Sequence, residues 1–486
     1  MCGIAGFVGH SATGVRERLE RMSGALVHRG PDDGGLLVDR GSGLAMRRLS
    51  IVGIETGAQP ILSEDATVAI VGNGEIYNAP ELRAELEARG HRFRGGSDIE
   101  VALHLFEELG EELLGRLNGM FALAILERPS GRILVARDRL GIKPLFHATT
   151  AAGTLFASEI PALRRGLEPS ESALLEADPL ALRDFLSLGY VPSPRTMHRG
   201  IRRLPPGHRM WITPGGAEPD CWWNLPDFTP EERSVDGWAE EAAELIADAV
   251  RLRTMGDVPA GAFLSGGLDS GTVVGLLARQ VGGPVPAFTL AFDDPRLDEL
   301  EDARRTARHF GLEHHVETLS GVRFEEVEAL LGSFGEPFAD VSLLPTHRVS
   351  RLAAERVKFV ISGDGGDELF GGYPWLHREA RMRALPGAVL AASRCLGPLL
   401  RATQSSVGAG FLGKALRLAG DLASDSASAF IRRRSLCPPG RLRSLLHPRI
   451  RAEWRALPPS TLERHAARLS GEPLELLLDL DRRHSL

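Results

Sequence analysis

Cysteine is scarce in this chain: only four occur among 486 residues. They stand far apart and include no CxxC pair: Cys2, Cys221, Cys395 and Cys437. This pattern argues against a disulfide framework and against a thiolate metal site. Three of the four are expected to be ordinary core or surface residues, whereas Cys2 directly follows the first methionine.

Long apolar runs are also missing, since no stretch approaches the ~20 residues that a membrane-spanning helix needs. The N-terminus shows no basic segment followed by an apolar one, the pattern of a secretory signal peptide. Hydrophobic residues make up 43% and charged residues 25% of the chain, as in soluble globular proteins. We therefore expect a cytoplasmic protein of two or three domains.

Lysine occurs only at Lys143, Lys358 and Lys414, which indicates a compositional bias toward arginine. The formal net charge is -7, but residues 377–486 hold 19 Lys and Arg against 9 Asp and Glu, so the rest of the chain carries -17. A basic segment can contact nucleic acid or phosphate. This one lacks interleaved aromatic residues and spaces its arginines as on a helix, so solvated helix faces are expected instead.

Cys2 has the chemistry of a nucleophile that carries its own base. Removal of Met1, which a small following side chain favours, leaves a free α-amine beside the Cys2 thiol. Such an amine titrates near pH 8, so part of it is uncharged at neutral pH and can accept the thiol proton. The ordinary alternative is a small apolar residue at a chain end.

The first part of the chain reads as short strands and turns with two helices, the pattern of an α+β layered domain. One predicted strand runs from Gly43 to Val52. Polar clusters stand where strands give way to turns: 28–32, 47–52, 73–78 and 96–98. Arginine can hold a carboxylate, a carboxylate can hold an ammonium group, and Asn with a glycine N–H can stabilise an oxyanion. With Cys2, these clusters supply the parts of a site for an amino-acid amide.

From Cys2 to about Glu159, including Asp138–Leu145 and Ala157–Glu159, the chain resembles the class II glutamine amidotransferases. The resemblance implies an α+β N-terminal-nucleophile (αββα) glutaminase domain in which Cys2 attacks the amide carbon of glutamine. The implied catalytic residues are Cys2 with Asn73 and Gly74 as the oxyanion hole. The implied glutamine-binding residues are Arg48, which would take the substrate carboxylate, and Leu49, Ser50, Ile51, Val52, Asn73, Gly74, Glu75 and Asp98.

A second domain follows a linker rich in Pro and Gly. Val258–Leu264 reads as a buried strand, and the string SGGLDS (265–270) follows it and opens a helix. Strand, glycine-rich turn and helix form a phosphate cradle, because the backbone can come close and the N–H groups face the anion. Further on, a strand at Phe359–Ser362 runs into GDGGDELFGGY, whose three acidic groups within five residues suit Mg²⁺ bound with ATP phosphates.

The SGGLDS string resembles the PP-loop of ATP pyrophosphatases, and the whole arrangement resembles the glutamine-hydrolysing asparagine synthetases. The resemblance implies an α/β parallel-sheet PP-loop synthetase domain with a helical C-terminal part. The implied ATP-binding residues are Leu264, Ser265, Gly266, Gly267, Asp269, Ser270, Leu290, Ser362 and Gly363. Asp269 and Asp367 would bind Mg²⁺, and Asp364 would be catalytic beside the acyl-adenylate.

The predicted domains are a glutamine amidotransferase domain at 2–190, a linker at 191–234 and an asparagine synthetase-like ATP-binding domain at 235–486. The resemblance fades after Tyr373 and revives only at Leu474–Leu480. Family members continue through a further segment and a lysine that assists amide formation, which this sequence lacks. The synthetase domain is therefore expected to be C-terminally incomplete.

The expected function is glutamine-dependent amide synthesis. Ammonia released at Cys2 would reach a carboxylate, most simply aspartate, that ATP activates as an acyl-adenylate. The expected partners are the small molecules glutamine, ATP and aspartate, with Mg²⁺, without nucleic acid or membrane, and a homodimer stays open. Two alternatives remain: amidation of another carboxylate in a biosynthetic pathway, or an incomplete protein that keeps only glutaminase or binding activity.

Overall fold

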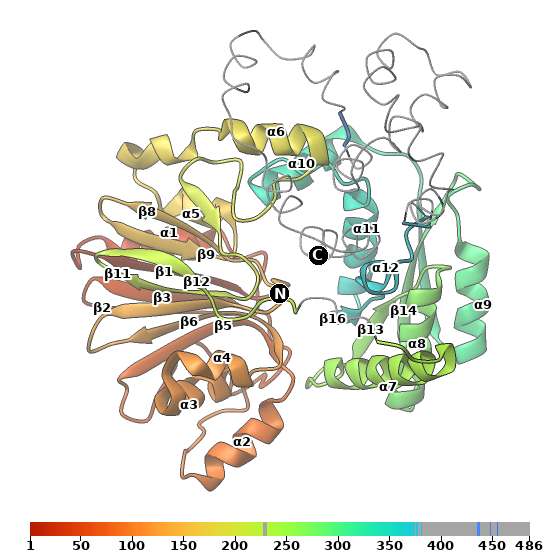
Figure 1. Cartoon of the computed structure of the whole chain (residues 1–486), viewed down its shortest axis with the longest axis horizontal. Coiled ribbons are helices and arrows are strands. Elements are labelled where there is room, and N and C mark those ends of the chain that lie inside the picture. The colour runs from red at the N-terminus through yellow and green to blue at the C-terminus, as the bar shows by residue number, and fades with distance from the viewer. Residues whose placement is uncertain are drawn as a thin grey trace. The chain divides into compact units, whose positions relative to one another are not determined.

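The computed structural model describes residues 1–226, 231–374, 376–377, 381, 435–437, 448 and 454 (Figure 1). They belong to two compact units. The larger unit comprises residues 1–176, 198–336 and 341–364, and the smaller unit comprises 177–197, 337–340 and 365–486. Most of the predicted helical C-terminal part lies outside the described residues.

The N-terminal part of the larger unit is built on two antiparallel six-stranded sheets. The first has the order β10-β8-β9-β1-β3-β2 and contains β1 (Gly3–Gly9), β2 (Asp33–Asp39), β3 (Ser42–Arg48), β8 (Phe146–Thr150), β9 (Gly153–Ala157) and β10 (Ile201–Arg203). The second has the order β12-β11-β7-β6-β5-β4 and contains β4 (Ile61–Leu62), β5 (Val68–Ile76), β6 (Gly119–Glu127), β7 (Arg132–Arg137), β11 (His208–Thr213) and β12 (Gly216–Cys221).

Successive side chains on a strand point to opposite faces of its sheet, so the apolar side chains of each sheet are divided between two core layers. On β1, Ile4 and Val8 pack in the core that both sheets share, whereas Ala5 and Phe7 pack on the helix side. Helices α1 (Val15–Gly24) and α5 (Ile160–Gly166) cover that face, and α2 (Ala79–Ala88), α3 (Ile99–Leu109) and α4 (Leu113–Arg116) cover the other sheet (Figure 1). The predicted αββα arrangement is confirmed.

The predicted strand from Gly43 to Val52 is too long, because β3 ends at Arg48. Beyond that point the backbone N–H of Leu49 donates to Cys2 Sγ and that of Ser50 donates to Asp32. These side chains take donors that a sheet ladder would otherwise use, so residues 49–52 leave the sheet.

The C-terminal part of the larger unit contains a four-stranded parallel sheet, order β15-β14-β13-β16, which confirms the predicted α/β class. Its strands are β13 (Ala260–Phe263), β14 (Pro286–Phe292), β15 (Glu313–Leu319) and β16 (Phe359–Ile361). Its helices are α7 (Val235–Arg253), α8 (Leu268–Val281), α9 (Leu300–Phe310), α10 (Phe324–Phe334) and α11 (Leu343–Ala354). Because the strands are parallel, the loops that follow them meet at one edge.

The described part of the smaller unit includes α6 (Pro179–Leu188) and α12 (Gly366–Phe370). Helix α6 begins with a side-chain cap, since Asp178 accepts the backbone N–H of Leu180. Helix α12 carries Asp367 and is followed by Gly371, whose left-handed backbone suits glycine.

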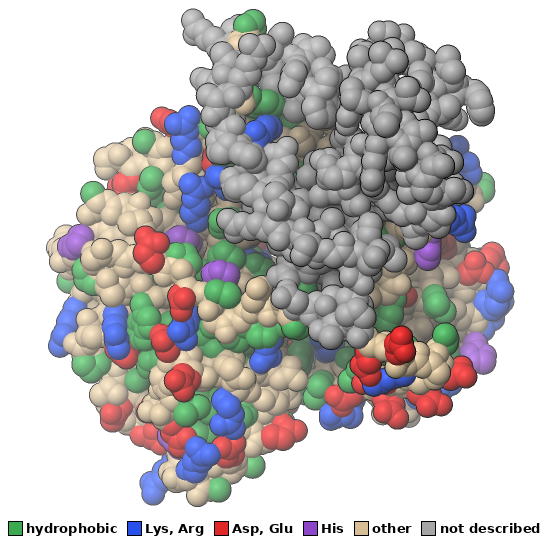
Figure 2. All heavy atoms as spheres, in the orientation of Figure 1, with side chains coloured by type: hydrophobic (Ala, Val, Ile, Leu, Met, Phe, Trp, Pro, Cys, Tyr) green, Lys and Arg blue, Asp and Glu red, His purple; other side chains and the backbone are tan. Residues whose placement is uncertain are grey.

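Charged side chains of both signs are spread over the visible face, and acidic side chains gather over α7 (Figure 2). The exposed acids of α7, among them Asp236, Glu240 and Glu244, account for part of the negative surplus in the first 376 residues. Among the residues that the structure describes, no helix has the length and apolar character to cross a membrane. The described cysteines Cys2, Cys221 and Cys437 are free thiols.

Candidate active site

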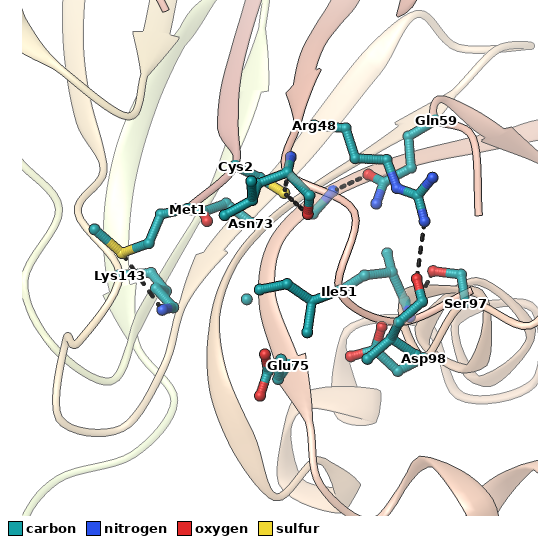
Figure 3. A pocket seen from close by; sticks show the side chains of 15 residues that line it. Met1, Cys2, Arg48, Ile51, Gln59, Asn73, Glu75, Ser97, Asp98 and Lys143 are labelled. Carbon is teal, nitrogen blue, oxygen red and sulfur yellow. Dashed lines mark hydrogen bonds between the residues drawn. The ribbon is translucent and has the colours of Figure 1, made fainter. Parts of the chain in front are cut away.

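One cavity in the N-terminal part gathers side chains from segments that are far apart in the sequence (Figure 3). It is lined by Met1, Cys2, Arg48, Leu49, Ile51, Val52, Gln59, Gly72, Asn73, Gly74, Glu75, Ser97, Asp98, Ile99 and Lys143. Strand β1 starts directly after Cys2, β3 ends at Arg48, β5 supplies residues 72–75, and α3 begins after Asp98. The ends of neighbouring strands and a helix therefore meet around the Cys2 thiol.

Hydrogen bonds to its backbone and to its sulfur hold Cys2 in place. Arg29 Nε donates to the Cys2 carbonyl oxygen at 2.8 Å, and the Leu49 N–H donates to Sγ at 3.4 Å. Burial raises the pKa of the Cys2 thiol, so the sulfur is protonated at neutral pH. Burial lowers the pKa of the Met1 α-amine to about 6, so an amine in this cavity is largely uncharged at neutral pH.

Asn73 provides a donor that the protein itself leaves unused. Its Nδ2 is buried and has no hydrogen-bond partner among the described residues. Leaving a buried donor unpaired costs roughly 1–3 kcal/mol, so this N–H₂ group is suited to an oxygen that enters the cavity. The neighbouring Gly74 must be glycine, because an added Cβ would lie 2.0 Å from the Met120 carbonyl oxygen of the adjacent β6.

Arg48 is almost fully buried and holds the loop that follows it. Its Nη2 donates to the carbonyl oxygens of Val52 and Gly53 at 2.8 and 2.7 Å, and Nη1 donates to Ile54 at 3.2 Å. A guanidinium has five N–H donors, so these contacts to carbonyl oxygens leave one on Nε and one on Nη1. The same loop is fastened from the other side, since Gly53 N–H donates to the Asp257 carboxylate at 2.8 Å.

Two buried carboxyls contribute negative charge to the cavity. Burial, followed by the nearby Asp98 charge, raises the pKa of Glu75 to about 7. Burial also raises the pKa of Asp98 to about 6, although its Oδ2 accepts the Ile76 N–H at 2.7 Å. A cationic ligand would favour the ionised form of both carboxyls, because its positive charge offsets the charge that burial disfavours. The pair is therefore suited to bind a cation.

Most of the predicted glutamine-site residues line this cavity: Cys2, Arg48, Leu49, Ile51, Val52, Asn73, Gly74, Glu75 and Asp98. Ser50 does not, since its N–H turns away to Asp32 and its carbonyl oxygen accepts Lys358 Nζ at 3.3 Å. The sequence interpretation missed Gln59, and it named the segments that contain Ser97 (96–98) and Lys143 (138–145) without giving either residue a role. Gln59 Oε1 accepts the Gly72 N–H at 2.7 Å, and Lys143 is carried in by a loop that Asp138 organises.

The position of Lys143 depends on the Asp138 carboxylate, which accepts four backbone N–H groups. The donors are Phe121, Leu140, Ile142 and Lys143, at 3.0 to 3.2 Å. This network folds residues 138–143 into a tight loop and places the Lys143 ammonium in the cavity, where burial lowers its pKa. The predicted Asp138–Leu145 motif therefore acts as a scaffold for one charged side chain.

The predicted nucleotide residues lie at one edge of the parallel sheet. Residues 264–270 follow β13, Leu290 lies in the adjacent β14, and Ser362 and Gly363 follow β16 on the other side. The loop after β13 is closed by hydroxyl contacts, since Ser265 and Ser270 Oγ lie 2.8 Å apart and Gly267 N–H donates to Ser265 Oγ at 3.0 Å. Gly267 also precedes α8, whose N–H groups face this loop.

Small residues let the two loops at this edge pack closely against each other. A Cβ added at Gly363 would lie 2.8 Å from the Ser270 backbone nitrogen. The Gly266 N–H donates to a carboxylate, Glu299 Oε2, at 3.0 Å. Asp364 Oδ2 accepts the Ser362 hydroxyl at 2.8 Å. Asp367 belongs to the smaller unit, where its carbonyl oxygen accepts the Gly372 N–H.

Comparison with known proteins assigns both halves of the chain. Residues 1–223 match the family described as glutamine amidotransferase domain, and residues 241–476 match the family described as asparagine synthase. Among solved structures, glutamine phosphoribosylpyrophosphate amidotransferase from Bacillus subtilis overlays with a TM-score of 0.35 at 16% identity, over 67% of this chain and 70% of that chain. That likeness is too weak to add to the assignment.

Three relatives give the same result. Asparagine synthetase [glutamine-hydrolyzing] 1 of Bacillus subtilis is 36% identical over 78% of this chain and 60% of its own length. A putative asparagine synthetase 2 of Methanocaldococcus jannaschii is 34% identical over 77% of this chain and 76% of its own length, and the Zea mays enzyme is 34% identical over 78% and 61%. The chain thus spans about 60% of the Bacillus subtilis relative and three quarters of the archaeal one. It belongs to the family of glutamine-hydrolysing asparagine synthetases.

Proposed function

We propose that this chain forms an amide with nitrogen taken from glutamine, with aspartate as the acceptor and asparagine as the product. The observation that carries the proposal is the cavity in which the Cys2 thiol, the unpaired Asn73 Nδ2 and the charged side chains of Arg48, Glu75 and Asp98 meet. These are the groups needed to attack an amide, to stabilise the oxyanion and to hold an amino acid by both of its charged ends.

The first step is a nucleophilic attack by the Cys2 sulfur on the glutamine amide carbon. Once Met1 is removed, the free α-amine of Cys2, which ordinarily titrates near pH 8, is partly uncharged at neutral pH. It therefore accepts the thiol proton while the new S–C bond forms and the carbonyl electron pair moves to oxygen. The amine then returns the proton to the leaving nitrogen, ammonia departs, and water hydrolyses the thioester to glutamate.

The acceptor carboxylate is activated in the second half of the chain. ATP supplies the energy for this activation when it is bound. The residues proposed to hold it are Leu264, Ser265, Gly266, Gly267, Asp269, Ser270, Leu290, Ser362 and Gly363, with Asp269 and Asp367 as magnesium ligands and Asp364 beside the activated carboxylate. We keep 2–190, 191–234 and 235–486 as the proposed domains, a cytoplasmic enzyme as the proposed setting and a homodimer as an assembly to test by light scattering.

The proposal is tested with the purified chain and four measurements. Glutamate is measured with glutamine alone, and pyrophosphate and asparagine are measured after addition of ATP, Mg²⁺ and aspartate. Intact mass shows whether Met1 has been removed. We expect all three products from a chain that is lighter by one methionine residue, with pyrophosphate release dependent on aspartate.

Each other outcome points to a different function. Pyrophosphate that appears only with another carboxylate in place of aspartate would favour a different acceptor. Glutamate without any pyrophosphate would leave a glutaminase, and neither product would leave a binding protein. Glutamate formation by a chain that retains Met1 would contradict the proposed base.

Glutamine binding should weaken as the solution becomes more acidic. The Glu75 carboxyl, with a pKa of about 7, must be ionised to hold the substrate ammonium group, and it takes up a proton as the pH falls below that value. We therefore expect KM for glutamine to rise about tenfold between about pH 8 and pH 6, because the ionised fraction falls by that factor. Steady-state glutaminase rates across this range measure the effect.

Two variants separate Glu75 from general effects of pH. Glu75→Gln should raise KM at pH 8 and remove most of its pH dependence. Glu55→Gln changes an exposed carboxyl in a nearby loop and should leave the profile unchanged. A profile that is the same in Glu75→Gln as in the unmodified chain would exclude Glu75 as the titrating group.

A further inference from the structure

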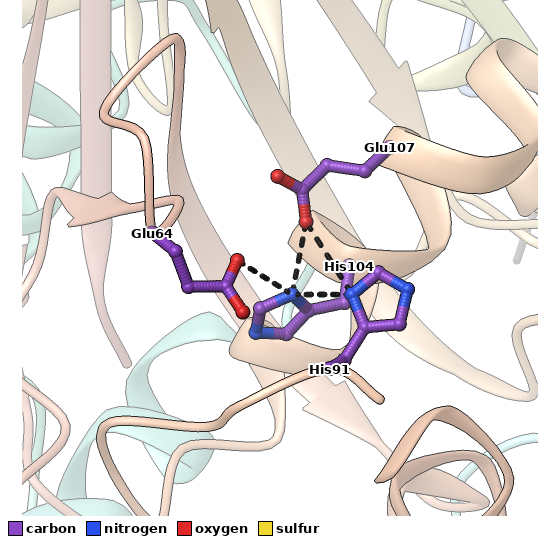
Figure 4. Close-up of side chains that lie close together, drawn as sticks. All are labelled: Glu64, His91, His104 and Glu107. Carbon is purple, nitrogen blue, oxygen red and sulfur yellow. Dashed lines mark hydrogen bonds and ion pairs between the residues drawn. The ribbon is translucent and has the colours of Figure 1, made fainter. Parts of the chain in front are cut away.

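Outside the Cys2 cavity, two imidazoles and two carboxylates converge on one point (Figure 4). Glu64 lies in the turn between β4 and β5, His91 follows α2, and His104 and Glu107 stand three residues apart on one face of α3. One donor atom from each side chain lies within 4.8 Å of all the others. No step of the proposed reaction uses these four residues.

Four of the six separations between the donor atoms lie near those of a tetrahedral metal site. His104 Nδ1 lies 3.1 Å from His91 Nδ1, 2.9 Å from Glu107 Oε2 and 3.9 Å from Glu64 Oε2, and His91 Nδ1 lies 3.6 Å from Glu107 Oε2. Zinc bonds of 2.0–2.2 Å at tetrahedral angles hold ligand atoms about 3.3 Å apart. Small shifts of exposed carboxylates would complete the geometry, since Glu64 is the most exposed of the four.

The ring nitrogens on the far side also fit metal ligation. His91 Nε2 lies 3.1 Å from Glu108 Oε1, and Glu108 is itself held by Arg89. His104 Nε2 is buried, lacks a hydrogen-bond partner among the described residues and has the Glu100 carboxylate as its nearest acid, at 3.9 Å. Metal-binding histidines commonly donate the second ring N–H to a carboxylate, which fixes the ring and its tautomer.

The proton positions on His91 and His104 also favour a cation between the two rings. If both rings are neutral and hydrogen-bond through Nδ1, one ring must carry its proton there, and its Nε2 lone pair then faces a carboxylate. A cation between the two Nδ1 atoms removes the conflict, because each ring can then place its single proton on Nε2. The Phe93 ring packs edge-on against His104, with centroids 4.5 Å apart, and limits rotation of the imidazole.

We propose that Glu64, His91, His104 and Glu107 bind a zinc ion. All four positions of the tetrahedron are filled by protein side chains, as in structural zinc sites, so the ion stabilises the fold and does not react. It ties the segment after α2 to the face of α3. Glu100, on the same helix, accepts the N–H groups of Arg94 and Gly95, and Ser97 and Asp98 follow directly and line the Cys2 cavity. The zinc ion would therefore hold in place the loop that delivers Asp98.

Cobalt titration of the full chain tests the site directly. After removal of metals with EDTA, we expect one equivalent of Co²⁺ to give the strong visible absorption of a tetrahedral complex, and Zn²⁺ to displace it. Zn²⁺ should also raise the Tm and slow hydrogen exchange in residues 89–98. His91→Gln and Glu107→Gln, which change partly exposed side chains, should each weaken Co²⁺ binding by at least about tenfold. His10→Gln alters an exposed histidine before α1 and should bind as the unmodified chain does.

If the four side chains share protons and bind no metal, the Co²⁺, EDTA and Zn²⁺ measurements give different results. In that case no stoichiometric Co²⁺ absorption appears, and EDTA and Zn²⁺ leave the Tm unchanged. Either result overturns the proposal, as does an affinity for Co²⁺ that both variants retain. A weak absorption typical of octahedral Co²⁺ would equally exclude the four-ligand site.

Discussion

Cys2→Ala is expected to reduce glutamine hydrolysis by about four orders of magnitude or more, since loss of a nucleophile removes the covalent route altogether. The substitution deletes only a sulfur atom, whose hydrogen bonds are with the backbone groups of Leu49. The fold should therefore survive. Synthesis driven by added ammonium salt should continue, because ammonia then no longer has to come from glutamine. Glutamate release, and pyrophosphate release with ammonium chloride, are the two measurements.

Cys221→Ala is the matched control for this prediction. Cys221 is an exposed free thiol at the end of β12, and among the described residues its Sγ donates to the Trp223 carbonyl oxygen. The control should keep both activities. If Cys2→Ala still hydrolysed glutamine at more than a trace rate, another group would be the nucleophile. Loss of the ammonia-driven reaction in a correctly folded Cys2→Ala chain would instead mean that Cys2 is needed for the second half.

Much of the cavity could be predicted because its residues stand next to one another in the sequence. Asn73, Gly74 and Glu75 lie on a single strand, and Arg48 to Val52 form one segment, so a linear motif contains them. The layered fold was expected from short strands with two helices and from the resemblance, and alternation on β1 agrees with it, since Ile4 and Val8 pack in the same core.

Residues that arrive through long-range contacts were not predictable in this way. Lys143 enters the cavity because Asp138 folds the intervening loop, a contact that the resemblance of residues 138–145 did not specify. The available signals were the scarcity of lysine and the place of Lys143 inside the 138–145 string. The prediction that the strand continues through Val52 was wrong for a related reason. The backbone N–H groups of Leu49 and Ser50 donate to Cys2 and Asp32, which lie far from them in the sequence.

The four proposed zinc ligands carry no sequence motif either. His91 and His104 are 13 residues apart, and Glu64 stands 27 residues before His91. Only the packing of α2 and α3 on one sheet brings them together. Short motifs capture ligands that share a turn or a helix, and of this set only His104 and Glu107 do.

Asn73→Ala is expected to lower kcat for glutamine hydrolysis by about 10²–10³, equivalent to about 2.7–4 kcal/mol of transition-state stabilisation. The Nδ2 group has no partner among the described residues, so it can donate to the oxyanion without first breaking another hydrogen bond. KM should change little, because the charge on the substrate oxygen develops only in the transition state. Steady-state kinetics with the Met1-processed chain measure both constants.

Thermal stability distinguishes this role from a structural one. A buried asparagine that supports the fold loses stability when truncated, whereas removal of an unpaired Nδ2 relieves a desolvation cost, so Asn73→Ala should keep or raise the Tm. Asn78→Ala provides the opposite control: its amide bonds the backbone of Arg116 and Asn118, so the Tm should fall while kcat is kept. A lower Tm with unchanged kcat in Asn73→Ala would place this side chain in the scaffold, and the oxyanion would then depend on backbone N–H groups such as that of Gly74.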